Sequence, residues 1–181
     1  MGDLADYIFG EAHNSVKAIL AGLFLREGNR FSWRNTDIAE WEGLPAGMLA
    51  SFAGRKLVRY ELAIGPGLLS LCGVQDVLRL IPRALSIAGG IETRRDEYYL
   101  ANLAVLPDHQ NRGIGSGLLK HAEGKARLAG LGKCSLIVDL LNPGARRLYE
   151  SCGYHVVYSK EYPGPAEDAH AGYHRMVKVL D

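Results

Sequence analysis

The stretch from residue 98 to residue 117 constrains this chain most, because an apolar run, a glycine-rich turn and a helical pattern follow one another there. The run Y-Y-L-A-N-L-A-V-L at 98–106 predicts a strand, which Pro107 ends. Alternating glycines then stand at Gly113, Gly115 and Gly117. After them, apolar residues recur at helical spacing as far as Ala126. Because the first N–H groups of a helix lack intrahelical partners, this order predicts a binding site for an anion such as a phosphate.

Two common nucleotide-binding loops are excluded by the residues around these glycines. A dinucleotide-binding loop G-x-G-x-x-G would need glycine where Leu118 stands, and a Walker A loop would need serine or threonine where Cys134 stands. The loop resembles instead the acetyl-CoA loop of the GNAT superfamily of N-acetyltransferases, whose pattern is Q/R-x-x-G-x-G/A. That pattern reads here Gln110-Asn111-Arg112-Gly113-Ile114-Gly115.

A second block strengthens the resemblance. Residues 142–154 read N-P-G-A-R-R-L-Y-E-S-C-G-Y, and the superfamily carries N-x-x-A-x-x-L-Y-x-x-x-G-F/Y after its fifth strand. Every fixed position is matched, by Asn142, Ala145, Leu148, Tyr149, Gly153 and Tyr154. The resemblance is close over the C-terminal half of the chain and weaker over the N-terminal half.

The resemblance implies an α/β (α+β) fold with a mixed, mostly antiparallel central sheet flanked by helices. We expect one N-acetyltransferase domain over residues 1–181. The superfamily usually opens with a strand that carries I-R-x-A, and this chain starts where the following helix is expected. Either the sheet has lost that edge strand or the start of the chain is truncated.

The composition is that of an ordinary globular protein, with 48% apolar and 23% charged residues. A net charge of +1 gives no electrostatic case for nucleic acid or for an anionic membrane as a partner. The cysteines Cys72, Cys134 and Cys152 show no metal-binding spacing, so we expect no metal site and a reducing, cytoplasmic location. No apolar run is long enough to predict a membrane span.

Periodicity and turn residues place the remaining elements. Helices are predicted at 4–9, 16–24, 113–129 and 145–151, and strands at 37–41, 46–52, 87–91, 98–106, 135–140, 154–161 and 173–179. The charged run at 92–97 is predicted to be a solvated loop. Residues 55–88 are a mostly apolar insertion between the third and fourth strands of the superfamily. This insertion is an extra core layer, a lid over the acceptor pocket, or the contact of a homodimer.

Acetyl-CoA is the cosubstrate that the resemblance implies. Backbone N–H groups of the glycine loop are expected to hold its pyrophosphate, from residues Gln110, Asn111, Arg112, Gly113, Ile114, Gly115, Ser116 and Gly117. In the superfamily a bulge splays the fourth strand from the fifth and frees backbone groups for the pantetheine. Here those positions are Leu103, Ala104 and Val105, and the helix after the fifth strand adds Asn142, Ala145 and Tyr149.

Tyr149 is the best catalytic candidate, since the matching tyrosine of the superfamily donates a proton to the departing sulfur. A phenol is protonated at neutral pH and suits that role. The plain alternatives are that Tyr149 only packs its helix and that Asn142 only caps it.

The general base is left open by the sequence. Some superfamily members carry a glutamate eleven residues before the first glutamine of the loop, and Tyr99 stands at that position here. Glu97, Asp139 and His174 are the remaining candidates, beside a chain of water molecules.

The resemblance implies direct acetyl transfer in a ternary complex, and no nucleophile motif argues for an acetyl-enzyme. Acidic residues are expected around the acceptor end, at Glu92, Asp96, Glu97, Asp139, Glu167 and Asp168. Although Arg94, Arg95 and Lys160 partly offset them, they favour a small cationic amine or a peptide N-terminus as acceptor. The plain alternative is that these acids are ordinary solvated loop charges. The alternative is a non-catalytic domain that binds or senses acyl-CoA on the same scaffold.

Overall fold

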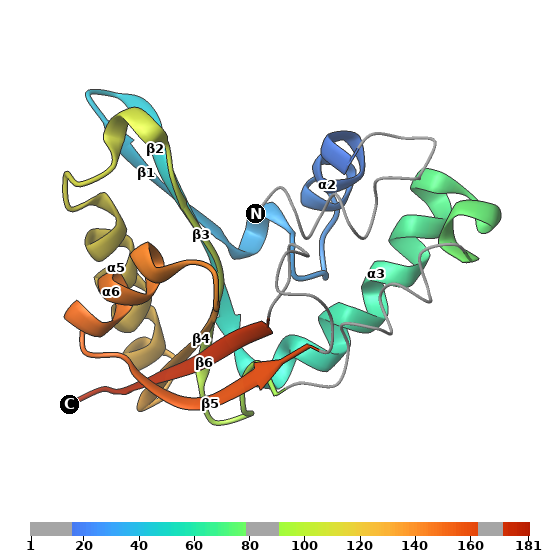
Figure 1. Cartoon of the computed structure of the whole chain (residues 1–181). Coiled ribbons are helices and arrows are strands. Elements are labelled where there is room, and N and C mark those ends of the chain that lie inside the picture. Colours follow the sequence, from blue (N-terminus) through green and yellow to red (C-terminus); the bar gives the residue numbers. More distant parts are fainter. Residues whose placement is uncertain (1–15, 79–90, 163–171) are drawn as a thin grey trace.

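The computed structural model describes residues 16–78, 91–162 and 172–181 (Figure 1). Its helices are α2 (Val16–Phe24), α3 (Leu57–Cys72), α5 (Ile114–Leu128) and α6 (Pro143–Ser151). Its strands are β1 (Thr36–Trp41), β2 (Leu44–Ala53), β3 (Tyr98–Val105), β4 (Lys133–Asp139), β5 (His155–Glu161) and β6 (Gly172–Val179). The helix expected at 4–9, most of the strand expected at 87–91, and the acids Glu167 and Asp168 lie outside the described residues.

The strands form one six-stranded sheet in the order β1-β2-β3-β4-β6-β5. Within it β3 and β4 run parallel, whereas the other neighbouring pairs are antiparallel. The parallel pair is possible because α5 connects the two strands across one face of the sheet. The expected fold, a mixed and mostly antiparallel sheet flanked by helices, is confirmed.

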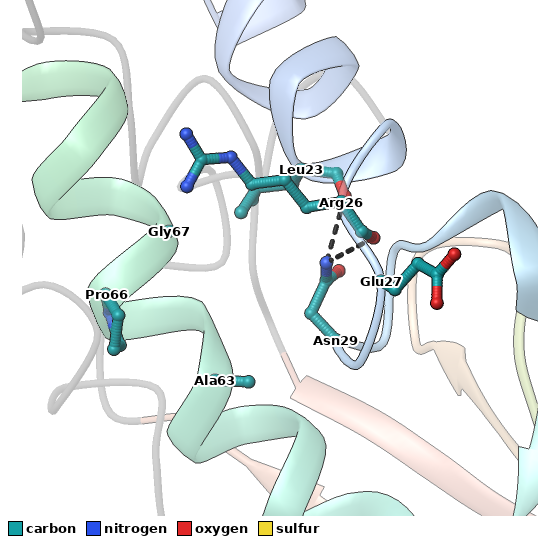
Figure 2. A pocket seen from close by; sticks show the side chains of 7 residues that line it. All are labelled: Leu23, Arg26, Glu27, Asn29, Ala63, Pro66 and Gly67. Atoms are coloured by element: carbon teal, nitrogen blue, oxygen red, sulfur yellow. Dashed lines mark hydrogen bonds between the residues drawn. The ribbon is translucent and has the colours of Figure 1, made fainter.

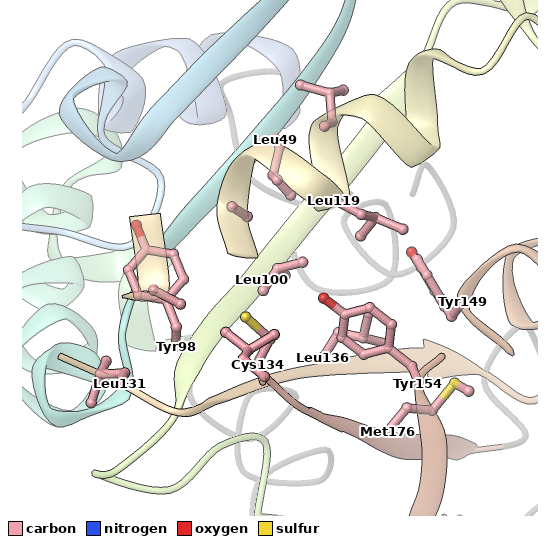
Figure 3. Packing of buried hydrophobic residues seen from close by; sticks show 14 of the residues in the cluster. Leu49, Tyr98, Leu100, Leu119, Leu131, Cys134, Leu136, Tyr149, Tyr154 and Met176 are labelled. Atoms are coloured by element: carbon pink, nitrogen blue, oxygen red, sulfur yellow. The ribbon is translucent and has the colours of Figure 1, made fainter. Parts of the chain in front are cut away.

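One face of the sheet carries α5 and α6 and holds the main hydrophobic core. Alternate residues of the central strands point to this face, as Leu100, Leu136 and Met176 do, and they pack against Leu119 of α5 (Figure 3). The cluster contains the buried residues Leu49, Ala53, Tyr98, Leu100, Leu118, Leu119, Ala122, Ala126, Leu131, Cys134, Leu136, Val138, Tyr149, Tyr154, Met176 and Leu180.

The opposite face carries α3, which lies within the expected insertion (Figure 1). Tyr60 of α3 packs edge-on against Phe52 of β2, and Phe52 packs edge-on against Tyr99 of β3, with ring centroids 5.0 and 5.6 Å apart. The insertion therefore adds a helical layer, and this layer lies on the face opposite α5 and α6.

A smaller cluster joins α3 to α2 through Ile19 and Leu23. The side-chain amide of Asn29 ends α2 by donating hydrogen bonds to the carbonyl oxygens of Leu23 and Arg26, at 2.9 and 3.0 Å. A pocket of about 310 Å³ remains between this turn and the Ala63–Gly67 side of α3 (Figure 2).

Candidate active site

The glycine loop has the backbone geometry of an anion site. Gly113 caps α5 in the left-handed conformation with φ of 79°, a conformation that glycine adopts without strain. The N–H of Gly117 donates to the carbonyl oxygen of Gly113 at 2.9 Å, so it belongs to the first helical hydrogen bond. The N–H groups of 114–116 precede that bond and lie at the positive end of the helix dipole. A Cβ at Gly117 would meet no atom within 4 Å, so the first turn is open to a ligand there.

Gly115 has a different role from the other two glycines. It is buried, and a Cβ at this position would lie 3.1 Å from Cδ2 of Leu148 on α6. Glycine at this position lets α5 and α6 approach each other closely, so its first effect is on helix packing. A substitution there would disturb the core as well as the loop.

Two polar side chains of the loop contact protein groups. The side-chain amide of Gln110 donates to the carbonyl oxygen of Val105 at 3.2 Å and ties the loop to the end of β3. The guanidinium of Arg112 lies 5.6 Å from the ring centroid of Trp41 on β1. Arg112 also lines a groove of about 700 Å³ between β1 and the start of α5, together with Gly113 and Gly117.

Strands β3 and β4 diverge towards this loop. Their pairing covers three residues of each strand and ends at Leu100 and Leu136. Just beyond that point, the pairing of β3 with β2 skips Ala101. This shift in register is a β-bulge. The remainder of β3, including 103–105, faces β4 across an opening that we call the fork. An unpaired strand edge of this kind can hydrogen-bond an extended ligand such as a pantetheine arm.

Tyr149 projects from α6 into the core on the face that carries the glycine loop (Figure 3). Its side chain is 8% exposed, and its ring centroid lies 6.3 Å from that of Tyr154. Burial raises the pKa of Tyr149 to about 12, so the phenol keeps its proton at neutral pH. The geometry suits both a proton donor and a packing residue. Asn142 caps α6, because its side-chain oxygen accepts a hydrogen bond from the N–H of Ala145 at 3.0 Å.

Glu97 is enclosed in an ion pair. Its carboxylate accepts hydrogen bonds from the guanidinium of Arg175 and from the backbone N–H of Arg94, and both pair members are buried, with side chains 5% exposed or less. Burial alone would raise the pKa of Glu97, but the hydrogen bonds from Arg175 and Arg94 outweigh it and lower that pKa. Such a carboxylate is a weak base and has little access to water. The geometry favours a structural role.

His174 and Asp139 lie on opposite faces of the sheet. The imidazole of His174 lies 3.1 Å from Nη1 of Arg146 and 2.7 Å from Oγ of Ser159, so both of its nitrogens are engaged on the α6 side. Asp139 ends β4 beyond the last pair with β3, and its Oδ1 accepts the backbone N–H of Leu141 at 2.7 Å. Of the three candidate bases, Asp139 is the one at the open side of the fork.

A polar network on the face of the sheet that carries α3 was not predicted from the sequence. The hydroxyl of Tyr99 donates to Oε2 of Glu92 at 2.6 Å, and the same oxygen lies 2.9 Å from Nη2 of Arg30. Nη1 of Arg30 lies 2.6 Å from Oε1 of Glu61 on α3. Burial opposes ionisation of Glu92, but the charge of Arg30 and the hydrogen bond from Tyr99 outweigh it and lower the pKa of Glu92.

The expected solvated loop at 92–97 is therefore wrong for two of its residues, Glu92 and Glu97. Both carboxylates turn inward because an arginine distant in the chain, Arg30 for Glu92 and Arg175 for Glu97, compensates each charge. Arg94, Arg95 and Asp96 are exposed, as expected. Among the described residues no group of histidine, cysteine and carboxylate side chains could hold a metal ion, and no helix is long and apolar enough to cross a membrane.

Comparisons with known proteins agree with this geometry. A model of the Acetyltransferase (GNAT) family matches residues 28–154. The [Ribosomal protein bS18]-alanine N-acetyltransferase of Escherichia coli K12 is 41% identical over 59 residues, which is 33% of this chain and 40% of that protein. The match thus spans less than half the length of this curated relative.

Solved structures share the fold. The structure described as an acetyltransferase has a TM-score of 0.70 at 23% identity and covers 96% of this chain and 85% of its own. An N-acetyltransferase from Staphylococcus aureus Mu50 has a TM-score of 0.68 at 21% identity, with 97% and 93% covered. The ribosomal-protein-S18-alanine N-acetyltransferase from Escherichia coli has a TM-score of 0.54 at 21% identity, with 100% and 90% covered.

Proposed function

Since this chain belongs to the GNAT family of acetyltransferases, we propose that it transfers the acetyl group of acetyl-CoA directly to an amine. The observation that carries the proposal is the fork between β3 and β4, with the glycine-capped start of α5 at its open end. This arrangement offers unpaired strand edges for an extended arm and helical N–H groups for a pyrophosphate.

The residues present fit acetyl-CoA. Gly113 turns the chain into α5 with a positive φ, and the space at Gly117 admits a phosphate close to the backbone. The first-turn N–H groups of 114–116 supply donors, and Arg112 adds a positive charge beside them. The edge of β3 at 103–105 would hold the pantetheine arm. When bound, acetyl-CoA supplies the acetyl group as a reactive thioester.

Two side chains are proposed to move the protons. Tyr149 keeps its proton at neutral pH and is proposed to donate it to the departing thiolate. Asp139 lies at the open side of the fork, on the other face of the sheet, and is proposed to accept the proton of the amine, directly or through water. Glu97, the other carboxylate expected near the acceptor, is proposed to hold Arg175 in place.

The acceptor is proposed to be a cationic amine, either a small molecule or the N-terminus of a peptide. Asp139 places a carboxylate on the proposed acceptor face, which attracts an ammonium group, whereas the charge of Glu92 is shared with Arg30. A relative named as acting on the alanine of a ribosomal protein supports a peptide N-terminus.

Release of thiol from acetyl-CoA, measured across a panel of amines, tests the proposal. The panel contains an oligopeptide with a free N-terminus, a polyamine and an amino sugar phosphate. We expect turnover with the first two and none with the phosphate. Binding of acetyl-CoA by calorimetry, without thiol release for any amine, would support the alternative, a domain that binds or senses acyl-CoA without catalysis.

A further inference from the structure

The hydroxyl of Tyr173 is buried without a hydrogen-bond partner in the part of the chain that the structure describes. Tyr173 is 7% exposed, so the hydroxyl is largely removed from water. An unsatisfied buried hydroxyl is unfavourable, and native proteins rarely retain one without a reason. A ligand that brings a hydrogen-bond acceptor to this position would supply the reason.

The position of Tyr173 in the sheet places it beside the fork. It pairs across β6 and β4 with Asp139, which lies three residues beyond the last β4 residue paired with β3. Neighbouring Met176 and His174 point to the side of the core and α6. Tyr173 and Arg175 therefore lie on the other face, away from the glycine loop. A cosubstrate bound at α5 leaves this face of the fork for the acceptor.

Aromatic rings and charged side chains of both signs surround Tyr173. The ring centroids of Tyr158 and Tyr162 lie 6.4 and 6.3 Å from that of Tyr173. Nζ of Lys160 lies 4.9 Å from the ring centroid of Tyr162, so a primary ammonium already rests against one of these rings. Asp139 adds a carboxylate across the strand pair.

The phenol of Tyr173 is a donor at neutral pH. Burial, the neighbouring phenols and the charge of Glu92 raise the pKa of Tyr173 to about 12. The charge of Arg175, on the same face of β6, acts in the opposite direction. A neutral oxygen is a better partner for the hydroxyl than an anionic one, because an anion would lie close to the carboxylate of Asp139, which would repel it.

We propose that Tyr173 is a specificity-determining residue that donates a hydrogen bond to the carbonyl oxygen of an α-amino amide, as in the first residue of a peptide. The ammonium of the same acceptor lies between Asp139 and the tyrosine rings. This inference deepens the proposed acetyltransferase function and rests on it.

Covalent geometry allows one acceptor molecule to bind Asp139 with its ammonium group and Tyr173 with its carbonyl oxygen. The amine nitrogen and the carbonyl oxygen of an α-amino amide are about 3 Å apart. Directly opposed residues of antiparallel strands have Cα atoms about 4.5–5.5 Å apart, so Asp139 and Tyr173 can reach adjacent atoms of one molecule. An alkylamine would leave the hydroxyl unpaired, and a free amino acid would bring a carboxylate next to Asp139.

The test compares kcat/KM of the wild type and of Tyr173→Phe for alaninamide, 2-aminobutane and alanine. Loss of the hydroxyl should lower kcat/KM for alaninamide about tenfold and leave kcat/KM for 2-aminobutane unchanged. For each amine, the ratio of the variant's kcat/KM to that of the wild type is taken. Each amine is thus compared with itself, so the different basicity of the two amines does not affect the result. Alanine should be the poorest acceptor of the wild type. Because the hydroxyl has no hydrogen-bond partner among the described residues, its removal breaks no protein contact, and the Tm of the variant should be equal to or higher than that of the wild type.

Three results would overturn the inference. They are an unchanged kcat/KM for alaninamide, an equal fall for alaninamide and 2-aminobutane, and alanine acetylated as well as alaninamide. A wild type that binds acetyl-CoA but releases no thiol with any of the acceptors would overturn the proposed function itself, and this inference with it.

Discussion

The hydroxyl of Tyr99 donates a hydrogen bond of 2.6 Å to the carboxylate of Glu92, seven residues earlier in the chain. Some members of the resembled superfamily carry a glutamate at the position of Tyr99. Here a tyrosine fills that position, and the carboxylate arrives from the preceding segment instead. Arg30 binds the same carboxylate, so two partners hold the ionised side chain of Glu92 on the face of the sheet that carries α3.

Tyr99 and Arg30 both bind Glu92, and removing one or the other should lower the free energy of unfolding by different amounts. Tyr99→Phe removes one hydrogen bond to a charged group and should cost about 1.5–3 kcal/mol in the free energy of unfolding. Arg30→Met leaves Glu92 and Glu61 without their shared cation and should cost more than Tyr99→Phe. The loss should stay below the roughly 3–5 kcal/mol of a fully buried pair, because the two glutamate side chains are 28% and 44% exposed. Urea denaturation of the three proteins at pH 7 measures both values. Equal stabilities would show that the network contributes nothing.

Gly117→Glu should abolish the binding of acetyl-CoA while the protein stays folded. The new carboxylate would occupy the open space at the first turn of α5 and repel the pyrophosphate. Folding should survive, because an acidic side chain is favourable near a helix N-terminus. The matched control is Gly124→Glu, which places the same charge on the same helix, also where a Cβ meets nothing within 4 Å. Calorimetric titration with acetyl-CoA should detect binding to the control only, and tight binding by Gly117→Glu would locate the pyrophosphate elsewhere.

Tyr149→Phe should slow the chemical step and leave the affinity for acetyl-CoA unchanged. The ring that packs beside Tyr154 is retained, and only the phenolic proton is lost. Loss of one general acid is expected to lower the rate of acetyl transfer about a hundredfold or more. Single-turnover measurement of thiol release separates this step from product release. A variant with the wild-type single-turnover rate would leave Tyr149 as a packing residue alone.

The C-terminal half of the fold could be predicted closely, because its signals are local. The strand, glycine turn and helix between 98 and 128, and the Asn142-capped helix, depend on short-range periodicity and backbone rules. Glycine patterns alone could not separate the role of Gly115, which admits Leu148, from that of Gly117, which leaves space for a ligand. That difference depends on how α5 and α6 pack, which is a long-range property.

The pairing of charged residues could not be predicted for the same reason. Arg30 and Glu92 are 62 residues apart in the chain, and Arg175 and Glu97 are 78 residues apart. A run of charges such as E-T-R-R-D-E reads as a solvated loop until its distant partners are known. The unpaired hydroxyl of Tyr173 is similarly hidden, since tyrosine in an alternating strand indicates a buried ring and says nothing of its hydroxyl.

The ion pair between Glu97 and Arg175 should make the free energy of unfolding depend on pH. Replacing Glu97 and replacing Arg175 should change this dependence in different ways. The folded-state pKa of Glu97 lies below its unfolded value of about 4.3, so its stabilisation is present above that pH and is lost as the pH falls through the folded pKa. Glu97→Gln should remove this acid-sensitive contribution. It also leaves Arg175 buried without its partner, which should cost about 3–5 kcal/mol at pH 7.

Arg175→Met should show the opposite dependence on pH. Without the arginine, burial raises the pKa of Glu97, so the ionised carboxylate destabilises the fold at pH 7 and part of the stability returns as the pH is lowered towards 5. The double variant Glu97→Gln with Arg175→Met leaves no buried charge at this position and should lose less stability than the two single losses added together. Urea denaturation of all four proteins between pH 4 and pH 8 measures these terms. Additive losses, or parallel pH profiles for the two single variants, would show that the two side chains do not act as a pair.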